Sequence, residues 1–121
     1  MTELDPVFDV VARYFGVLAE PTRLKITHAL CLGEKTVNEI VAETGATQTN
    51  VSRHLGLMHR HGVVARRKNG TQVIYSIADP TMIDLCRSVC TRIASTIDEK
   101  KPSQRQFLRL LPPPKKRRAA G

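Results

Sequence analysis

The chain has 121 residues, a formal net charge of +8 and a hydrophobic content of 41%. This length suits one small domain whose core a partner subunit would help to complete. No apolar run is long enough to cross a membrane, and the first residues lack the basic and apolar regions of a secretory signal peptide. We therefore expect a cytoplasmic protein with no membrane partner.

The positive charge is spread unevenly along the chain. Residues 1–99 hold 11 Lys and Arg against 11 Asp and Glu, so the excess comes from the eight basic residues among positions 100–121. No Asp or Glu occurs between Glu43 and Asp79. A phosphate-binding surface must lack carboxylates, whereas an ordinary solvated surface mixes both signs. The acid-free stretch therefore indicates DNA binding more strongly than the overall charge does.

Two helices are predicted before residue 34. Asp5 and Pro6 are typical of a helix start, and the helix that follows has a broad apolar face. This face consists of Val7, Val10, Val11, Tyr14 and Leu18, with Phe8 and Phe15 beside them. Its width predicts two contacts, one with the domain's own core and one with a second subunit. Glu20 and Pro21 interrupt the chain, and the second helix ends at Gly33.

Residues 36–61 are predicted to form two short helices joined by a glycine corner. Val37, Ile40 and Val41 recur at helical spacing, Gly45 can take the left-handed conformation that ends a helix, and Thr47 can cap the next one. This pattern predicts a helix-turn-helix.

The second of these helices has two unlike sides. An apolar stripe at i, i+4 and i+7 faces the core and consists of Val51, Leu55 and Met58. The side chains predicted to contact base edges are Gln48, Thr49, Asn50, Ser52 and Arg53. Their amide, hydroxyl and guanidinium groups match base edges in a major groove. For His54 two alternatives remain: a contact with a DNA phosphate, or a buried hydrogen bond to a neighbouring side chain.

Residues 63–77 have the pattern of a β-hairpin. Asn69-Gly70 is a preferred pair for a two-residue type I′ turn, and the following strand alternates as one with a single buried face should. The alternating apolar residues are Val73, Tyr75 and Ile77. Three cations near the tip, Arg66, Arg67 and Lys68, are predicted to contact the DNA backbone. A hairpin directly after a recognition helix is typical of the wing of a winged helix-turn-helix.

Asp79 and Pro80 open the last predicted helix, which runs to about Lys100. Its apolar residues include Met82, Cys86, Val89, Ile93 and Ile97. We expect residues 1–100 to form the DNA-binding and dimerisation domain and residues 101–121 to form a basic, disordered C-terminal tail.

Four strings in this order resemble those of the arsenical-resistance repressor (ArsR/SmtB) family of bacterial transcription regulators. They are Leu18-Ala-Glu-Pro-Thr-Arg-Leu24, Gln48-Thr-Asn-Val-Ser-Arg-His-Leu55, Gly62-Val-Val-Ala-Arg-Arg-Lys-Asn-Gly70 and Tyr75-Ser-Ile-Ala-Asp-Pro80. The resemblance implies a mainly α fold with a β-hairpin wing, five helices, and a homodimer formed through the first and last helices. It also implies a repressor that binds an inverted-repeat operator in double-stranded DNA until an inducer releases it.

Two metal sites known in this family are missing. Thr36-Val37-Asn38 stands where arsenite sensors often have Cys-Val-Cys, and residues 80–98 contain no histidine for a zinc or cobalt site. What remains is Cys86 and Cys90 at i, i+4, with Cys31 as a third thiol if the second helix packs nearby. We expect reduced thiols, and the sequence leaves two alternatives open for them. Either they sense a soft metal, a metalloid or a reactive sulfur or redox species, or they pack inertly in the core.

The sequence therefore predicts a dimeric, sequence-specific transcriptional repressor with an inducer that acts on cysteine thiols. The alternative is a nonspecific or architectural DNA-binding protein with no small-molecule inducer, for which the basic tail argues. We do not expect an enzyme, because no glycine-rich phosphate loop and no serine, histidine and acid arrangement can be identified.

Overall fold

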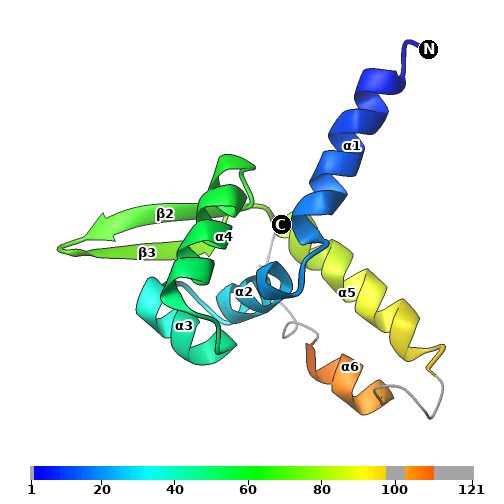
Figure 1. The fold of residues 1–121 in the computed structure, drawn as a ribbon. Coiled ribbons are helices and arrows are strands. Elements are labelled where there is room, and N and C mark those ends of the chain that lie inside the picture. Colours follow the sequence, from blue (N-terminus) through cyan, green and yellow to red (C-terminus); the bar gives the residue numbers. More distant parts are fainter. Residues whose placement is uncertain (1, 98–102, 111–121) are drawn as a thin grey trace, which may run out of the picture.

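The computed structural model describes residues 2–97 and 103–110. The elements are α1 (Asp5–Leu18), α2 (Pro21–Cys31), β1 (Lys35–Thr36), α3 (Val37–Thr44), α4 (Gln48–Arg60), β2 (Val64–Asn69), β3 (Gln72–Ile77), α5 (Pro80–Ala94) and α6 (Gln104–Leu110). The predicted fold class, mainly helical with a β-hairpin wing, is confirmed. Figure 1 shows α2, α3 and α4 clustered together, with the hairpin extending to one side and α1 and α5 to the other.

The core is built where the helix-turn-helix meets α2, the hairpin and the start of α5. Its fully buried side chains include Ile26, Ile40, Val51, Leu55, Met58 and Met82. These residues come from α2, α3, α4 and α5. The core therefore fixes the position of α4 while the other side of that helix remains open to solvent.

The hairpin confirms the predicted buried face but not the predicted turn. Tyr75 is buried and Val73 and Ile77 pack against the core. Asn69 pairs with Gln72, so the two turn residues are Gly70 and Thr71 instead of Asn69-Gly70. Gly70 has φ 66°, a conformation that favours glycine. Because the pairing shifts by an even number of residues, every side chain keeps its predicted face.

A third strand that the sequence pattern did not predict joins this hairpin. β1 pairs with β3, so β3 is the central strand of an antiparallel sheet in the order β1-β3-β2. Two residues are too few to show an alternating pattern, which is why β1 could not be recognised.

The C-terminal part differs from the prediction in two ways. α5 ends at Ala94 and not near Lys100. Directly after Ala94, the Ser95 hydroxyl donates to the Arg92 carbonyl and the Thr96 hydroxyl donates to the Ile93 carbonyl. Such side-chain bonds compete with a continuing helix.

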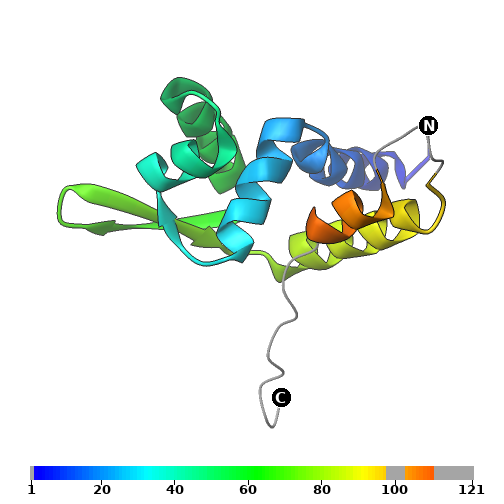
Figure 2. The same ribbon diagram turned by 90° about the horizontal axis from the view of Figure 1, so that it is seen from below.

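A sixth helix, α6, occupies part of the predicted tail. Ser103 and Gln106 form a reciprocal cap, in which each backbone N–H donates to the other's side-chain oxygen, at 2.8 and 3.3 Å. α6 lies alongside α5 in both ribbon views (Figures 1 and 2). The disorder predicted for the remainder of the tail concerns positions 101–102 and 111–121, which lie outside the described residues.

Most of the apolar face of α1 is uncovered in the single chain. Val17 is its only buried residue, while Val7, Phe8, Val10, Val11 and Phe15 are each at least 45% exposed. On α5, Val89 and Ile93 are also exposed. The contact with the domain's own core is therefore confined to the C-terminal end of α1, where Tyr14, Val17 and Leu18 pack.

A hydrogen bond joins α1 to the start of α5. Tyr14 Oη donates to Asp79 Oδ2 at 2.6 Å, and Asp79 Oδ1 caps α5 by accepting from the Thr81 N–H at 3.1 Å. Partial burial, together with this hydrogen bond and the charge of Asp79, raises the pKa of Tyr14 from 10.0 to about 12.

We expect this tyrosine to make folding sensitive to alkali. Because the folded state holds the phenol proton more tightly than the unfolded state, its contribution is complete below about pH 10 and is lost as pH rises through about 12. Tyr14→Phe should remove this part of the decline. Urea unfolding of both proteins at several pH values checks it, and parallel declines would contradict it.

Candidate DNA-binding surface

The corner between α3 and α4 is fixed by caps on both helices. Thr36 and Glu39 form a capping box at the start of α3, and their hydrogen bonds lower the pKa of Glu39. Gly45 ends α3 with φ 72°, in the left-handed conformation. Thr47 caps α4 by accepting from the Asn50 N–H at 3.2 Å. The predicted roles of Gly45 and Thr47 are confirmed, and they fix the angle at which α4 leaves the corner.

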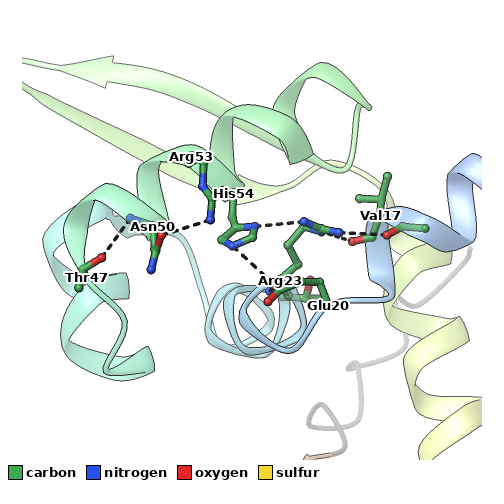
Figure 3. A network of polar contacts seen from close by, with 9 residues as sticks. Val17, Glu20, Arg23, Thr47, Asn50, Arg53 and His54 are labelled. Atoms are coloured by element: carbon green, nitrogen blue, oxygen red, sulfur yellow. Dashed lines mark hydrogen bonds and ion pairs between the residues drawn. The ribbon is translucent and has the colours of Figure 1, made fainter.

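α4 has the two sides that its sequence predicts. Val51, Leu55 and Met58 are no more than 1% exposed. The predicted base-contacting residues all lie on the exposed side: Gln48, Thr49, Asn50, Ser52 and Arg53. Arg53 Nη2 donates to Asn50 Oδ1 at 3.2 Å, so these two side chains support each other one turn apart (Figure 3).

His54 does not belong to this exposed side. It is 8% exposed, and its Nδ1 lies 3.1 Å from Arg23 Nη1. Arg can only donate, so Nδ1 accepts and Nε2 carries the proton, which faces Glu20 Oε2 at 3.7 Å. The expected phosphate contact of His54 is therefore corrected: burial leaves it bound to neighbouring side chains, which was the other alternative.

Arg23 is the centre of a polar network that the sequence pattern did not single out. Its Nε and Nη2 donate to the carbonyls of Val17 and Gly16, at 2.5 and 3.1 Å, at the end of α1 (Figure 3). The Gly16 carbonyl also accepts from the Ala19 N–H at 3.2 Å, and a cation is favourable at this end of the helix. The same guanidinium binds His54 on α4, so it joins α1, α2 and the recognition helix.

Glu20 completes the network at the start of α2. It caps this helix by accepting from the Arg23 N–H at 2.9 Å. Partial burial would raise the pKa of Glu20, but this hydrogen bond and the nearby His54 and Arg23 lower it. The only sequence signal for the pair was its place in the string Leu18-Ala-Glu-Pro-Thr-Arg-Leu24, which predicted a helix start and no link to α4.

The three cations of the wing, Arg66, Arg67 and Lys68, do not share one face. Arg66 lies opposite Tyr75 and Lys68 opposite Val73, so both project on the face of the sheet that carries the buried Tyr75. Arg67 projects on the other face, where its Nη2 lies 2.6 Å from Glu34 Oε1. All three are exposed. Among the described residues, Arg66 and Lys68 are therefore the wing cations without an ion pair, whereas Arg67 is paired with Glu34.

The three thiols meet at one place between α2 and α5. Cys31, Cys86 and Cys90 all line a cavity of about 370 Å³, and none is in a disulfide. Burial, followed by the effects of Cys90 and Cys31, raises the pKa of Cys86, and burial raises that of Cys90. No group of three or more His, Cys, Asp or Glu side chains within residues 2–97 and 103–110 has an arrangement that could hold a metal ion.

A two-sided recognition helix, a capped corner and a cationic hairpin define a winged helix-turn-helix DNA-binding protein. No helix in the described part of the chain has the length and apolar character needed to span a bilayer. The sequence profile of the family described as "Bacterial regulatory protein, arsR family" matches residues 20–66, from the N-cap of α2 into the wing.

Similar proteins agree with this match. Rv0081, an uncharacterised HTH-type transcriptional regulator of Mycobacterium tuberculosis, is 36% identical over 97 residues, covering 77% of this chain and 85% of that protein. Its crystal structure superposes with a TM-score of 0.69 at 35% identity, covering 76% of this chain and 96% of that one. The chain therefore belongs to the ArsR family of transcriptional regulators, as the sequence resemblance predicted.

Two further relatives carry more informative names. A probable mercury resistance operon repressor of Streptomyces lividans is 42% identical over 77 residues, covering 64% of this chain and 62% of that protein. The homodimeric winged helix-turn-helix DNA-binding domain of Mb0332 from Mycobacterium bovis, a possible ArsR-family regulator, has a TM-score of 0.64 at 29% identity. That match covers 79% of this chain and 88% of the other.

We expect Arg23→Met to lower the free energy of unfolding by about 1–3 kcal/mol, because the Val17 carbonyl and His54 Nδ1 lose their donor and the Gly16 carbonyl keeps only the Ala19 N–H. Arg60→Met is the matched control at an exposed position of α4 and should change it by about 0.5 kcal/mol or less. Urea unfolding measures both. Equal stability of the two variants would show that the network contributes nothing.

Proposed function

We propose that this chain is a homodimeric, sequence-specific transcriptional repressor that binds an inverted-repeat operator in double-stranded DNA. One observation carries the proposal. The exposed side of α4 offers only uncharged polar groups and cations, and the adjacent wing adds Arg66 and Lys68 on the sheet face that carries the buried Tyr75.

The side chains of α4 supply the base contacts. In the major groove Arg53 matches guanine O6 and N7, while Asn50 and Gln48 match adenine N6 and N7. Thr49 and Ser52 add hydroxyl groups that bond to bases or phosphates. Arg66 and Lys68 contact the DNA backbone and set the register of α4 without reading sequence. Arg67 contributes less to binding the DNA backbone, because its guanidinium is paired with the Glu34 carboxylate.

The uncovered apolar residues of α1 and α5 support the dimer. Five large apolar side chains of α1 and two of α5 are exposed in the single chain, which is unusual for a monomer. The relative from Mycobacterium bovis is described as homodimeric. A twofold pair places two copies of α4 about one helical turn of DNA apart, roughly 34–36 Å, which is why the operator is an inverted repeat.

Repression and its release are supported less directly. The relative from Streptomyces lividans is named as a repressor of a mercury resistance operon. In this chain Cys31, Cys86 and Cys90 converge on one cavity, and we propose that the inducer acts there on their thiols. The inducer classes that the sequence predicted are a soft metal or metalloid and a reactive sulfur or redox species. A metal would need the thiols to rearrange, since no ready site exists among the described residues.

The alternative is a protein that coats DNA without regard to sequence. Its main support is the basic segment from residue 100 to residue 121, which holds eight Lys and Arg residues. Salt separates the two functions, because nonspecific binding is almost entirely electrostatic, whereas base contacts keep a preference for one sequence.

We expect the wing cations to differ in how they affect salt dependence. Arg66→Ala and Lys68→Ala should each reduce the slope of log K against log salt by about 0.9, the value for one phosphate contact. Arg67→Ala, the matched control, should reduce it less. Fluorescence anisotropy with a selected operator and a scrambled duplex, from about 50 to 200 mM salt, measures both slope and preference. Loss of the preference at the higher salt would favour the coating function.

We expect thiol-directed inducers to release the wild-type protein from its operator and to leave a Cys86→Ser/Cys90→Ser variant bound. Arsenite, antimonite and a persulfide donor are the reagents, and anisotropy is the measurement. Because the pKa of both thiols is raised, release by the sulfur reagent should accelerate as pH increases above neutrality. Operator affinity that is the same in both proteins, with and without every reagent, would contradict thiol sensing.

A further inference from the structure

The cavity between α2 and α5 has the size and lining of a small-molecule site. Its volume of about 370 Å³ lies within the range of roughly 300–1,000 Å³ that is usual for such sites. α2 contributes Leu24 and Ala29, α5 contributes Ile83, and α6 contributes Leu110. The thiols of Cys86 and Cys90 add small, polarisable surface between these apolar groups. Three helices, together with Glu43 of α3, therefore line a space that is mainly apolar.

One residue of the lining has a polar atom with an unmet hydrogen bond. His28 lines the cavity, and its Nδ1 is buried without a hydrogen-bond partner in the part of the chain that the structure describes. A buried imidazole nitrogen that makes no hydrogen bond destabilises the fold, so a ligand group that bonded to it after a small turn of the His28 ring would gain affinity. The nitrogen is a donor or an acceptor according to the tautomer, and a hydroxyl group can satisfy either form.

The charged residues of the lining do not favour an ionised ligand. Lys25 and Glu43 are both exposed, and Glu43 Oε1 lies 3.0 Å from Lys35 Nζ, so its charge is already paired. An ion that entered the apolar interior would lose its hydration without gaining a buried counter-charge. The lining therefore selects an uncharged molecule.

The cavity and the uncovered apolar surface use neighbouring but different stripes of α5. Ile83, Cys86 and Cys90 follow each other at i, i+3 and i+7 and line the cavity. Val89 and Ile93 are spaced i, i+4 on the adjacent stripe and are exposed. A molecule that pushes α5 from the cavity side would therefore move the stripe proposed to contact the second subunit.

We propose that this cavity binds an uncharged, mainly apolar organic molecule that carries one hydroxyl-type group for His28 Nδ1, and that this binding is a regulatory input in addition to the thiol chemistry proposed above. The proposal rests on the proposed repressor function only for its effect on DNA, because the binding itself involves no DNA.

The test uses 1-naphthol and 1-methylnaphthalene, two probes of nearly equal shape, of which only the first has a hydroxyl group. Calorimetry with the full chain should find one site per chain for both. His28→Phe should weaken the binding of 1-naphthol by about 3- to 10-fold, the contribution of one hydrogen bond, and leave the affinity for 1-methylnaphthalene nearly unchanged. Equal effects on both probes, or no binding of either, would overturn the proposal.

Filling the cavity from either wall provides the second arm. Cys86→Phe on α5 and Ala29→Leu on α2 should each weaken both probes about tenfold or more, while Leu32→Phe, an exposed control on α2's C-cap, should not. Circular dichroism confirms folding. In the wild-type chain, bound 1-naphthol should also slow the alkylation of Cys86 and Cys90 by N-ethylmaleimide, a result that needs no variant.

The outcomes separate this proposal from the function on which it rests. Probes that bind the Cys86→Phe and Ala29→Leu variants as tightly as the wild-type chain, without protecting the thiols, occupy another surface such as the exposed face of α1. In that case the cavity proposal fails and the proposed repressor function is unaffected. Cavity binding that leaves the affinity for a selected operator unchanged removes the regulatory role. Cavity binding in a chain that prefers no DNA sequence removes the repressor instead.

Discussion

The guanidinium of Arg23 links α4, the helix proposed to read DNA, to α1, whose apolar face is uncovered in the single chain. It donates to the carbonyls of Gly16 and Val17 at the end of α1 and to His54 in the middle of α4. The backbone N–H of Arg23 donates to the Glu20 carboxylate. A planar group with donors in fixed directions transmits orientation better than apolar packing does, because its bonds weaken steeply with angle. A rotation of α1 would therefore change the orientation of the recognition helix α4.

The two ends of the molecule have opposite chemistry, which is the layout that a DNA-binding dimer needs. The polar side of α4 and the wing lie at one end, and the exposed apolar residues of α1 and α5 lie at the other (Figure 1). The cavity lies between α2 and α5, and on α5 it is next to the exposed stripe of Val89 and Ile93. A ligand there is well placed to change how two subunits meet, and thereby the spacing of two copies of α4.

Much of this arrangement was predictable because local chemistry specified it. The caps at Gly45 and Thr47, the apolar stripe of α4 and the buried face of β3 each depend on residues a few positions apart. The links that span the fold were not predictable: Arg23 to His54, Tyr14 to Asp79, and Arg67 to Glu34 join residues at least 31 positions apart. The C-terminal helix was a different case, since Ser103 and Gln106 form a capping box that the basic composition of the segment obscured.

Sedimentation of the chain at micromolar concentration tests most directly whether the uncovered apolar surface is an interface between two copies. The wild-type protein should sediment as a dimer, and a Val10→Asp/Val89→Asp variant should be a folded monomer with the same circular dichroism spectrum, because both positions are exposed in the single chain and would face apolar groups only in the pair. A wild-type chain that remained monomeric would leave a single copy of α4 to read DNA, and would contradict the account of a twofold repressor.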